Sequence, residues 1–240
     1  MIGAAAQGSS HFNGDIGALL VYTGELTYSQ VQNVEAYLNT RYALSLTFKK
    51  MLVCDGDSWM AGYSTYTPCP TQLATLLGSG WELYNGGAGG ETLANMESNA
   101  ATTVDRYWAS QNTSVLLTIG GINDIANGDS LATVQSRWIT YMTNRRAAGH
   151  THIVAQTLLT VNNVIVNAAE EIVRAAFNTW LKGAAAAAYY DHLFDAEAVT
   201  ELADPNNATY RDGDHVHPTT AGNAAWAAAL QTFLSGLGIN

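Results

Sequence analysis

Charged side chains are scarce in this chain, since Asp, Glu, Lys and Arg make up only 12% of its 240 residues. That share is about half of what a globular domain usually carries. Basic residues are the scarcest, with 10 Lys and Arg against 20 Asp and Glu, and the net charge is −10. An acidic surface repels phosphate backbones and anionic lipid, so we expect no nucleic-acid partner.

Cysteine and long apolar runs are also rare. Two cysteines, Cys54 and Cys69, are too few for a disulfide framework. Cys54 lies in the apolar run of residues 51–54, which predicts a buried thiol. A disulfide between Cys54 and Cys69 is the alternative, which the sequence does not decide. No apolar run approaches the roughly 18 residues that a membrane span needs.

The N-terminal residues have neither a basic start nor a sustained apolar stretch, so we expect no signal peptide in this chain. The few lysines and many Thr, Asn and Trp residues nevertheless favour an extracellular or secreted protein. The sequence does not indicate an oligomeric state.

Residues 1–46 differ in pattern from residues 47–240, and we expect two units. Residues 18–22 (Ala-Leu-Leu-Val-Tyr) predict a short strand. Thr27 and Gln30 then form a T-x-x-Q capping box, which predicts the start of a helix. The apolar face of this helix is expected to consist of Val31, Val34, Leu38 and Tyr42.

One strand and one helix cannot bury a core by themselves, so this segment must pack on the main domain or be the remnant of a larger upstream one. With its pattern F-x-G-x-I, Y, L-T and V-E-x-Y-L, it resembles the end of laminin-G-like (concanavalin-type) jelly-roll modules. Such modules often bind glycans, but the segment holds too little of the sheet for us to expect binding here.

From about residue 50 onward, short apolar runs alternate with helical patterns. We expect strands at residues 52–55, 81–84, 114–119, 152–156 and 189–194. We expect helices at residues 71–77, 92–108, 130–148, 166–188 and 221–234. This order predicts an α/β fold, a three-layer α/β/α sandwich around a parallel sheet of about five strands. Functional sites in such sheets form at the carboxyl ends of the strands.

Three polar segments follow predicted strands or precede the last helix. The segment Asp-Gly-Asp-Ser-Trp places Ser58 directly after the first strand, where Gly56 allows a tight turn. The segment Gly-Gly-Ile-Asn-Asp presents the amide of Asn123 after the third strand. Residues 85–92 are rich in glycine and could cradle an anion, but they do not fit the dinucleotide pattern G-x-G-x-x-G.

The third segment, Asp-Gly-Asp-His-Val-His-Pro, contains Asp214 and His217 at a spacing of three. In a turn, this spacing lets a carboxylate hold the imidazole Nδ1 and leaves Nε2 free to accept a proton. A metal site formed by Asp214, His215 and His217 is the alternative, although no remote third ligand is visible.

Together, these segments resemble the blocks of the SGNH (GDSL-like) hydrolase family, in the right order over residues 50–235. The resemblance implies a flavodoxin-like fold, Ser58 as nucleophile, and Asp214 and His217 as its activating pair. It also implies an oxyanion hole formed by Ser58, Gly90 and Asn123, with no metal and no cofactor. Trp59 stands where the namesake motif has Leu, and the G-x-S-x-G motif of α/β-hydrolases is absent.

The expected activity is hydrolysis of carboxylic esters through an acyl-enzyme. Short-acyl (acetyl) esters, those of carbohydrates included, are one substrate class, and longer-chain lipids, lysophospholipids or thioesters are the other. A catalytically inactive glycan-binding or structural module is the alternative of another kind.

The other histidines are expected to be structural or surface residues without a catalytic role, namely His11, His150, His152 and His192. By default, we expect the core to contain Tyr63, Trp81 and Trp108. Because Trp59 adjoins Ser58, a place in the wall of the acyl or sugar site is the alternative for this residue.

Overall fold

The computed structural model describes residues 16–110, 113–162 and 166–239. Its centre is a parallel five-stranded sheet in the order β2-β1-β3-β4-β5. The strands are β1 Lys50–Asp55, β2 Trp81–Asn85, β3 Ser114–Thr118, β4 His152–Gln156 and β5 His192–Phe194. The predicted parallel sheet is confirmed, with β5 shorter than the expected residues 189–194.

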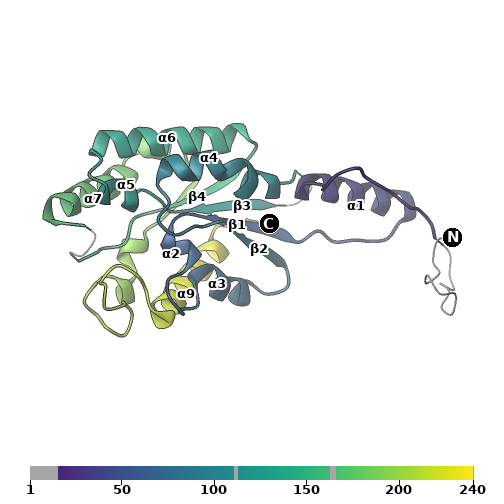
Figure 1. Cartoon of the computed structure of the whole chain (residues 1–240). Coiled ribbons are helices and arrows are strands. Elements are labelled where there is room, and N and C mark those ends of the chain that lie inside the picture. The colour runs from purple at the N-terminus through teal and green to yellow at the C-terminus, as the bar shows by residue number, and fades with distance from the viewer. Residues whose placement is uncertain (1–15, 111–112, 163–165, 240) are drawn as a thin grey trace.

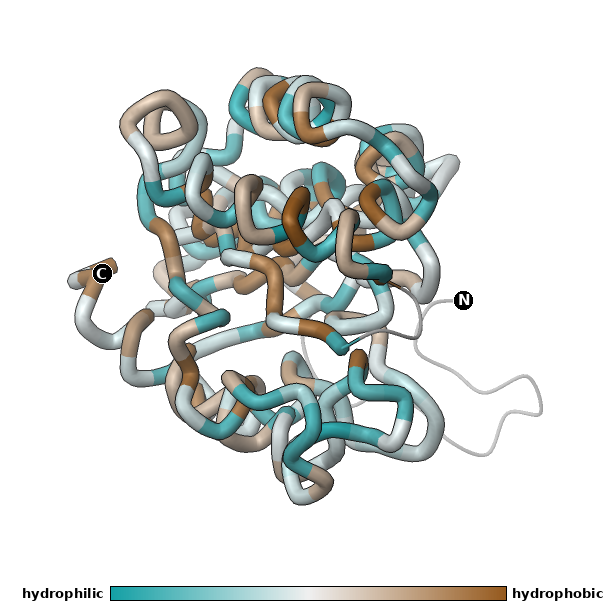
Figure 2. The backbone as a smooth tube through the Cα atoms, turned by 90° about the vertical axis from the view of Figure 1, so that its left-hand side faces the viewer, coloured by the Kyte–Doolittle hydropathy of each residue, from teal (hydrophilic) through white to brown (hydrophobic). Residues whose placement is uncertain are grey.

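The strands in the middle of the sheet are buried on both faces. All five residues of β3 are buried, and so are all but the first residues of β1 and β4. At the edge, the residues of β2 are only partly buried. Continuous apolar runs in the middle strands are what a parallel sheet covered on both sides requires. Figure 2 shows these apolar segments between the two outer layers of helices.

Helices cover both faces of the sheet (Figure 1). On one face, α3 (Cys69–Leu77) packs against α9 (Thr220–Gly236), with the short α2 (Ser58–Ala61) beside α3. On the other face, α6 (Leu131–Ala147) packs against α4 (Leu93–Thr103) and α7 (Ala168–Leu181), and α5 (Ile122–Ala126) contacts α6 and α7. The predicted three-layer α/β/α sandwich is therefore confirmed.

Two predicted helices are shorter than expected. Residues 166–188 do not form one helix, because α7 ends at Leu181 and Gly183 adopts an extended conformation before the single turn of α8 (Ala184–Ala187). The predicted helix at residues 92–108 ends at Thr103 and is followed by the 3-10 turn η1 (Asp105–Tyr107). Two further 3-10 turns, η2 (Ala196–Ala198) and η3 (Thr200–Leu202), follow β5.

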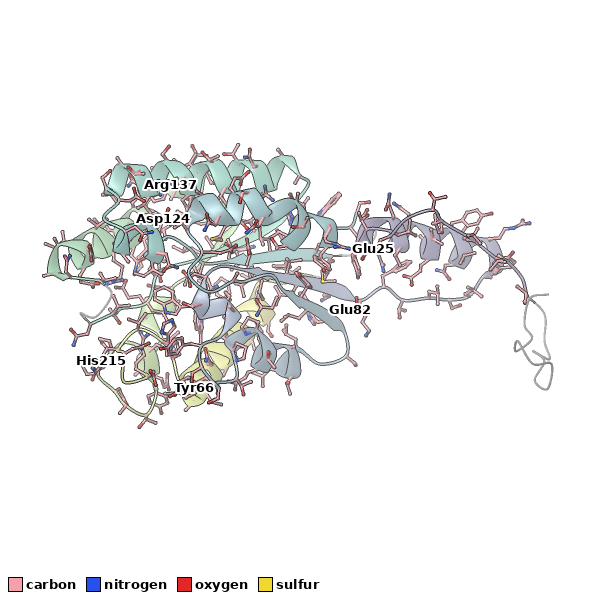
Figure 3. The ribbon with its side chains drawn as sticks, in the orientation of Figure 1. Glu25, Tyr66, Glu82, Asp124, Arg137 and His215 are labelled. Carbon is pink, nitrogen blue, oxygen red and sulfur yellow. The ribbon has the colours of Figure 1, made fainter. Side chains whose placement is uncertain are left out.

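Residues 16–46 lie at the opposite end of the sheet from the carboxyl ends of the strands (Figure 1). Helix α1 (Tyr28–Tyr42) begins at Thr27 with the predicted capping box. The Tyr28 hydroxyl lies 3.1 Å from the Glu82 carboxylate at the start of β2, and Arg106 pairs with Glu25 at 2.8 Å. Figure 3 shows Glu25 and Glu82 at this end of the sheet.

The predicted strand at residues 18–22 is wrong. These residues have no regular secondary structure and are exposed, and no other described segment pairs with them in a sheet. The apolar side of α1 is not well covered either, since Val31 and Tyr42 remain exposed. The division between residues 1–46 and residues 47–240 stays a prediction.

Both cysteines are buried and unpaired, which confirms the buried thiol at Cys54 and excludes the Cys54–Cys69 bridge. Burial raises the pKa of the Cys54 thiol, so the thiol stays protonated. Among the described residues, no helix has the length and apolar character needed to span a membrane.

Candidate active site

The strand order brings the predicted polar segments together. Strand β1 lies between β2 and β3, with Cys54 opposite Asn85 in β2 and Asp55 opposite Thr118 in β3. The three strands therefore end at the same level, and the loops that follow them meet at one edge of the sheet. The strand that follows β1 in the sequence, β2, lies on one side of it, and the next strand, β3, lies on the other side. Parallel sheets bind ligands at such a reversal of the strand order.

Ser58 is the first residue of α2, directly beyond the end of β1. Asp57 caps this short helix through a 2.9 Å hydrogen bond from the Trp59 backbone N–H to Asp57 Oδ1. Gly56 is needed because a Cβ at this position would lie 2.5 Å from the backbone oxygen of Ile119, in the loop after β3. The loops after β1 and β3 thus pack against each other without an intervening side chain.

His217 and Asp214 lie beside Ser58 as predicted. Ser58 Oγ is 2.8 Å from His217 Nε2, and His217 Nδ1 is 2.6 Å from Asp214 Oδ2. A carboxylate can only accept a hydrogen bond, so Nδ1 carries the proton and, in the neutral ring, Nε2 accepts one from the serine hydroxyl. This is the arrangement of a serine nucleophile with its base and orienting carboxylate.

The loop before α9 holds Asp214 in a tight turn. Asp214 Oδ1 accepts hydrogen bonds of 2.9 Å from the backbone N–H groups of Val216 and His217. Burial acts to raise the pKa of Asp214, but the hydrogen bonds from His217 and Val216 outweigh it, and the pKa is lowered from its usual value. Asp214 is therefore ionised at neutral pH and can stabilise an imidazolium on His217.

Gly90 and Asn123 line one cavity of about 300 Å³ together with Ser58 and His217. The Asn123 amide donates a 2.9 Å hydrogen bond to the Glu91 carbonyl, which fixes its orientation and leaves its second N–H available. The backbone N–H groups of Ser58 and Gly90 donate to no acceptor in the described part of the chain. The structure thus places all the predicted oxyanion donors at the cavity that Ser58 lines.

Asp124 of α5 joins this helix, which also carries Asn123, to the segment that follows Gly90. It is fully buried, and its carboxylate accepts a 2.8 Å hydrogen bond from the Leu93 backbone N–H at the start of α4. The other oxygen pairs with Arg137 of α6 at 2.7 Å, and Figure 3 shows the two residues side by side. We did not single out this residue from the sequence, although it follows Asn123 directly.

Two further buried carboxyl groups lie behind Ser58. Burial raises the pKa of Asp57 to about 7, and the nearby carboxylates of Asp124, Glu91 and Asp55 raise it too. Burial also raises the pKa of Asp55 to about 7, although the Tyr141 hydroxyl donates a hydrogen bond to it. Several acidic side chains therefore cluster behind the loop that carries Ser58, and some of them are protonated near neutral pH.

The metal alternative for Asp214, His215 and His217 does not fit the geometry. His215 Nδ1 faces the backbone oxygen of Pro205 at 3.2 Å, while His217 is engaged with Asp214 and Ser58. Across residues 16–110, 113–162 and 166–239, no three His, Cys, Asp or Glu side chains are grouped as metal ligands would be.

Two aromatic residues near Ser58 differ from the expectation: Trp59 lies in the core, and Tyr63 lies at the cavity. Trp59 is 1% exposed, does not line the cavity and donates an indole hydrogen bond of 3.0 Å to the Val216 carbonyl. Tyr63, expected in the core, is 40% exposed and lines the cavity. Among the other histidines, His150 is buried beside Asp105, and His11 lies outside the described residues.

Solved structures of the same fold come from several bacteria. A lipolytic protein of the G-D-S-L family from Veillonella parvula has a TM-score of 0.64 and 20% identity, covering 78% of this chain and 98% of its own. A psychrotrophic esterase from a Pseudoalteromonas species has a TM-score of 0.61 and 15% identity, with coverages of 80% and 100%. An acetylxylan esterase from Geobacillus stearothermophilus has a TM-score of 0.59 and 18% identity, with coverages of 81% and 96%.

A search of curated protein sequences found no match. The sequence profile of the GDSL-like Lipase/Acylhydrolase family, however, matches residues 54–225, which contain every residue of the candidate site. The chain is thus a hydrolase that belongs to the GDSL-like lipase/acylhydrolase family.

Proposed function

We propose that this protein hydrolyses short-acyl esters, acetyl esters of carbohydrates among them, through an acyl-enzyme on Ser58. The observation that carries the proposal is the unbroken hydrogen-bonded chain from Ser58 through His217 to Asp214. Ser58 and His217 also line a cavity, together with Gly90 and Asn123.

In the proposed mechanism, Ser58 Oγ attacks the ester carbonyl while His217 Nε2 takes the hydroxyl proton. The negative charge that develops on the carbonyl oxygen is stabilised by the backbone N–H groups of Ser58 and Gly90 and by the Asn123 amide. His217 then gives its proton to the departing alcohol oxygen as the C–O bond breaks. A water molecule, deprotonated by His217, releases the acid in the second half of the reaction.

The size of the cavity favours a small substrate. At about 300 Å³, it lies at the lower end of the range for ligand pockets. Ile122, Val166 and Val216 supply apolar walls, which suit an alkyl group rather than a charged one. The structural similarity to an acetylxylan esterase adds support for an acetylated carbohydrate as substrate.

The test is hydrolysis of p-nitrophenyl esters from acetate to laurate by wild-type protein, with a metal chelator present. We expect the highest kcat/KM for acetate, no effect of the chelator, and loss of turnover in Ser58→Ala with the melting temperature unchanged. Ser98→Ala is the matched control, because this exposed serine of α4 lies outside the cavity and bonds only the Asn95 carbonyl.

Other outcomes would contradict parts of the proposal. A maximum of kcat/KM at longer acyl chains would show that the protein is a lipase or thioesterase that uses the same site. Normal turnover in Ser58→Ala would disprove the proposed nucleophile. A well-folded protein without turnover on any ester would favour a binding module that has lost its activity.

A further inference from the structure

Tyr63 stacks directly on the imidazole of His217. The two ring centroids are 3.8 Å apart, and the ring planes differ by only 6°. Tyr63 follows α2 and lines the same cavity as Ser58, Gly90 and Asn123. It is nevertheless 40% exposed, whereas His217 is buried. The imidazole thus covers one face of the phenol ring, while a large part of the tyrosine stays accessible to solvent.

The departing alcohol must pass close to this ring. During acylation, His217 Nε2 donates its proton to the alcohol oxygen, which requires an approach to about 3 Å. The stacked ring of Tyr63 lies parallel to the imidazole that carries Nε2. Substituents of the alcohol therefore emerge beside the phenol ring. The acyl group, in contrast, must stay at Ser58 with its oxygen toward Gly90 and Asn123.

We propose that Tyr63 determines the specificity for the alcohol part of the ester and favours ring-shaped alcohols such as pyranoses. The inference rests on the proposed function of Ser58 and His217. An aromatic face is electron-rich and attracts the slightly positive C–H groups on the flat side of a sugar ring. Tyr63 needs no rearrangement to offer this surface, because the contact with His217 already holds it in place.

The test compares two esters that share one acyl group, the one that the wild-type protein prefers, and differ in the alcohol. One ester carries a methyl pyranoside as the alcohol, and the other carries ethanol. In Tyr63→Ala, kcat/KM for the sugar ester should fall roughly tenfold or more, while kcat/KM for the ethyl ester should change much less. Tyr63→Phe keeps the ring and should behave like the wild type on both esters.

Tyr37→Ala is the matched control, because this tyrosine is also exposed but belongs to α1 at the far end of the sheet. Melting temperatures show whether each variant folds, and Tyr63→Leu replaces Tyr63→Ala if the latter does not. An equal loss on both esters would show that Tyr63 only supports His217, and no loss on either would show that it does not contact the alcohol. Either result overturns the inference. Failure of the wild type on every ester would instead refute the proposed function.

Discussion

The indole Nε1 of Trp59 donates a hydrogen bond of 3.0 Å to the backbone oxygen of Val216. The residue directly after Ser58 is thereby tied to the residue directly before His217. Arg211 donates a second hydrogen bond to the same oxygen at 2.8 Å, and this arginine is itself buried. The distance between Ser58 and His217 thus depends on contacts that neither residue makes itself.

The variant Trp59→Phe should lower kcat more than it raises KM, because losing the indole N–H loosens the loop that carries His217. A displacement of about 1 Å in a catalytic group can cost roughly a hundredfold in rate. The measurement is steady-state kinetics together with the free energy of unfolding, which should fall by about 1 kcal/mol. Trp226→Phe is the control, since it removes a similar buried indole hydrogen bond that is made to Gln156 of β4 and not to the loop. Equal losses of activity in both variants would contradict this role of Trp59.

Asp214→Asn should reduce kcat by roughly 10³ to 10⁴ with the fold intact. The asparagine amide no longer selects the imidazole tautomer in which Nε2 is unprotonated, and it cannot stabilise an imidazolium by charge. Steady-state kinetics on the preferred ester provides the measurement. Asp212→Asn serves as control, because the Asp212 carboxylate accepts a hydrogen bond from Tyr66, while its bond to His217 is made by the backbone N–H and is kept in the variant. Activity of Asp214→Asn within about tenfold of the wild type would rule out the assigned orienting role.

Asn123→Ala should lower kcat by roughly 10² to 10³ and leave KM nearly unchanged, because the amide is expected to act mainly on the charge of the transition state. The control is Asn144→Ala, a change in a surface asparagine of α6 that bonds Glu97. A variant that raises KM while kcat stays constant would show that Asn123 binds the substrate without stabilising the oxyanion.

Asp57→Asn should increase stability more at pH 8 than at pH 4. The carboxyl group has a pKa of about 7 in the folded protein and 3.8 as its ordinary value. Between these values the unfolded chain releases the proton while the folded protein keeps it, so this group makes the wild type less stable as the pH rises. Asn can still accept the capping hydrogen bond but has no proton to lose.

The measurement for Asp57 is the melting temperature of both proteins at pH 4, 6 and 8. The difference between variant and wild type should grow with pH by at least about 2 °C. Asp55 has a similarly raised pKa of about 7, so the variant should keep part of the pH dependence. A difference that does not change with pH would show that Asp57 is ionised in the folded protein.

The order of elements and the candidate triad were accessible from the sequence, because both depend on local signals. Apolar runs marked the strands, and Asp214 and His217 lie close enough in the chain for one turn to join them. Ser58 and His217 are 159 residues apart, and only the resemblance to a known family linked them before the structure placed them 2.8 Å apart.

The roles of Trp59 and Tyr63 could not be predicted in the same way. Both are aromatic residues close to Ser58, and their positions depend on how the chain folds within α2 and directly after it. Trp59 is directed into the core, where the Val216 carbonyl accepts its N–H, and Tyr63 lies beyond Gly62, at which α2 ends. A strand at residues 18–22 was predicted from composition, but strand formation also needs a neighbouring strand, and no described segment provides one.

The separation of 159 residues between Ser58 and His217 also bears on protein synthesis. A chain leaving the ribosome exposes Ser58 early, but His217, the base proposed to activate it, emerges only after most of the domain has been translated. Since domains fold as units during synthesis, the nascent chain has no active serine until the loop before α9 is free to dock.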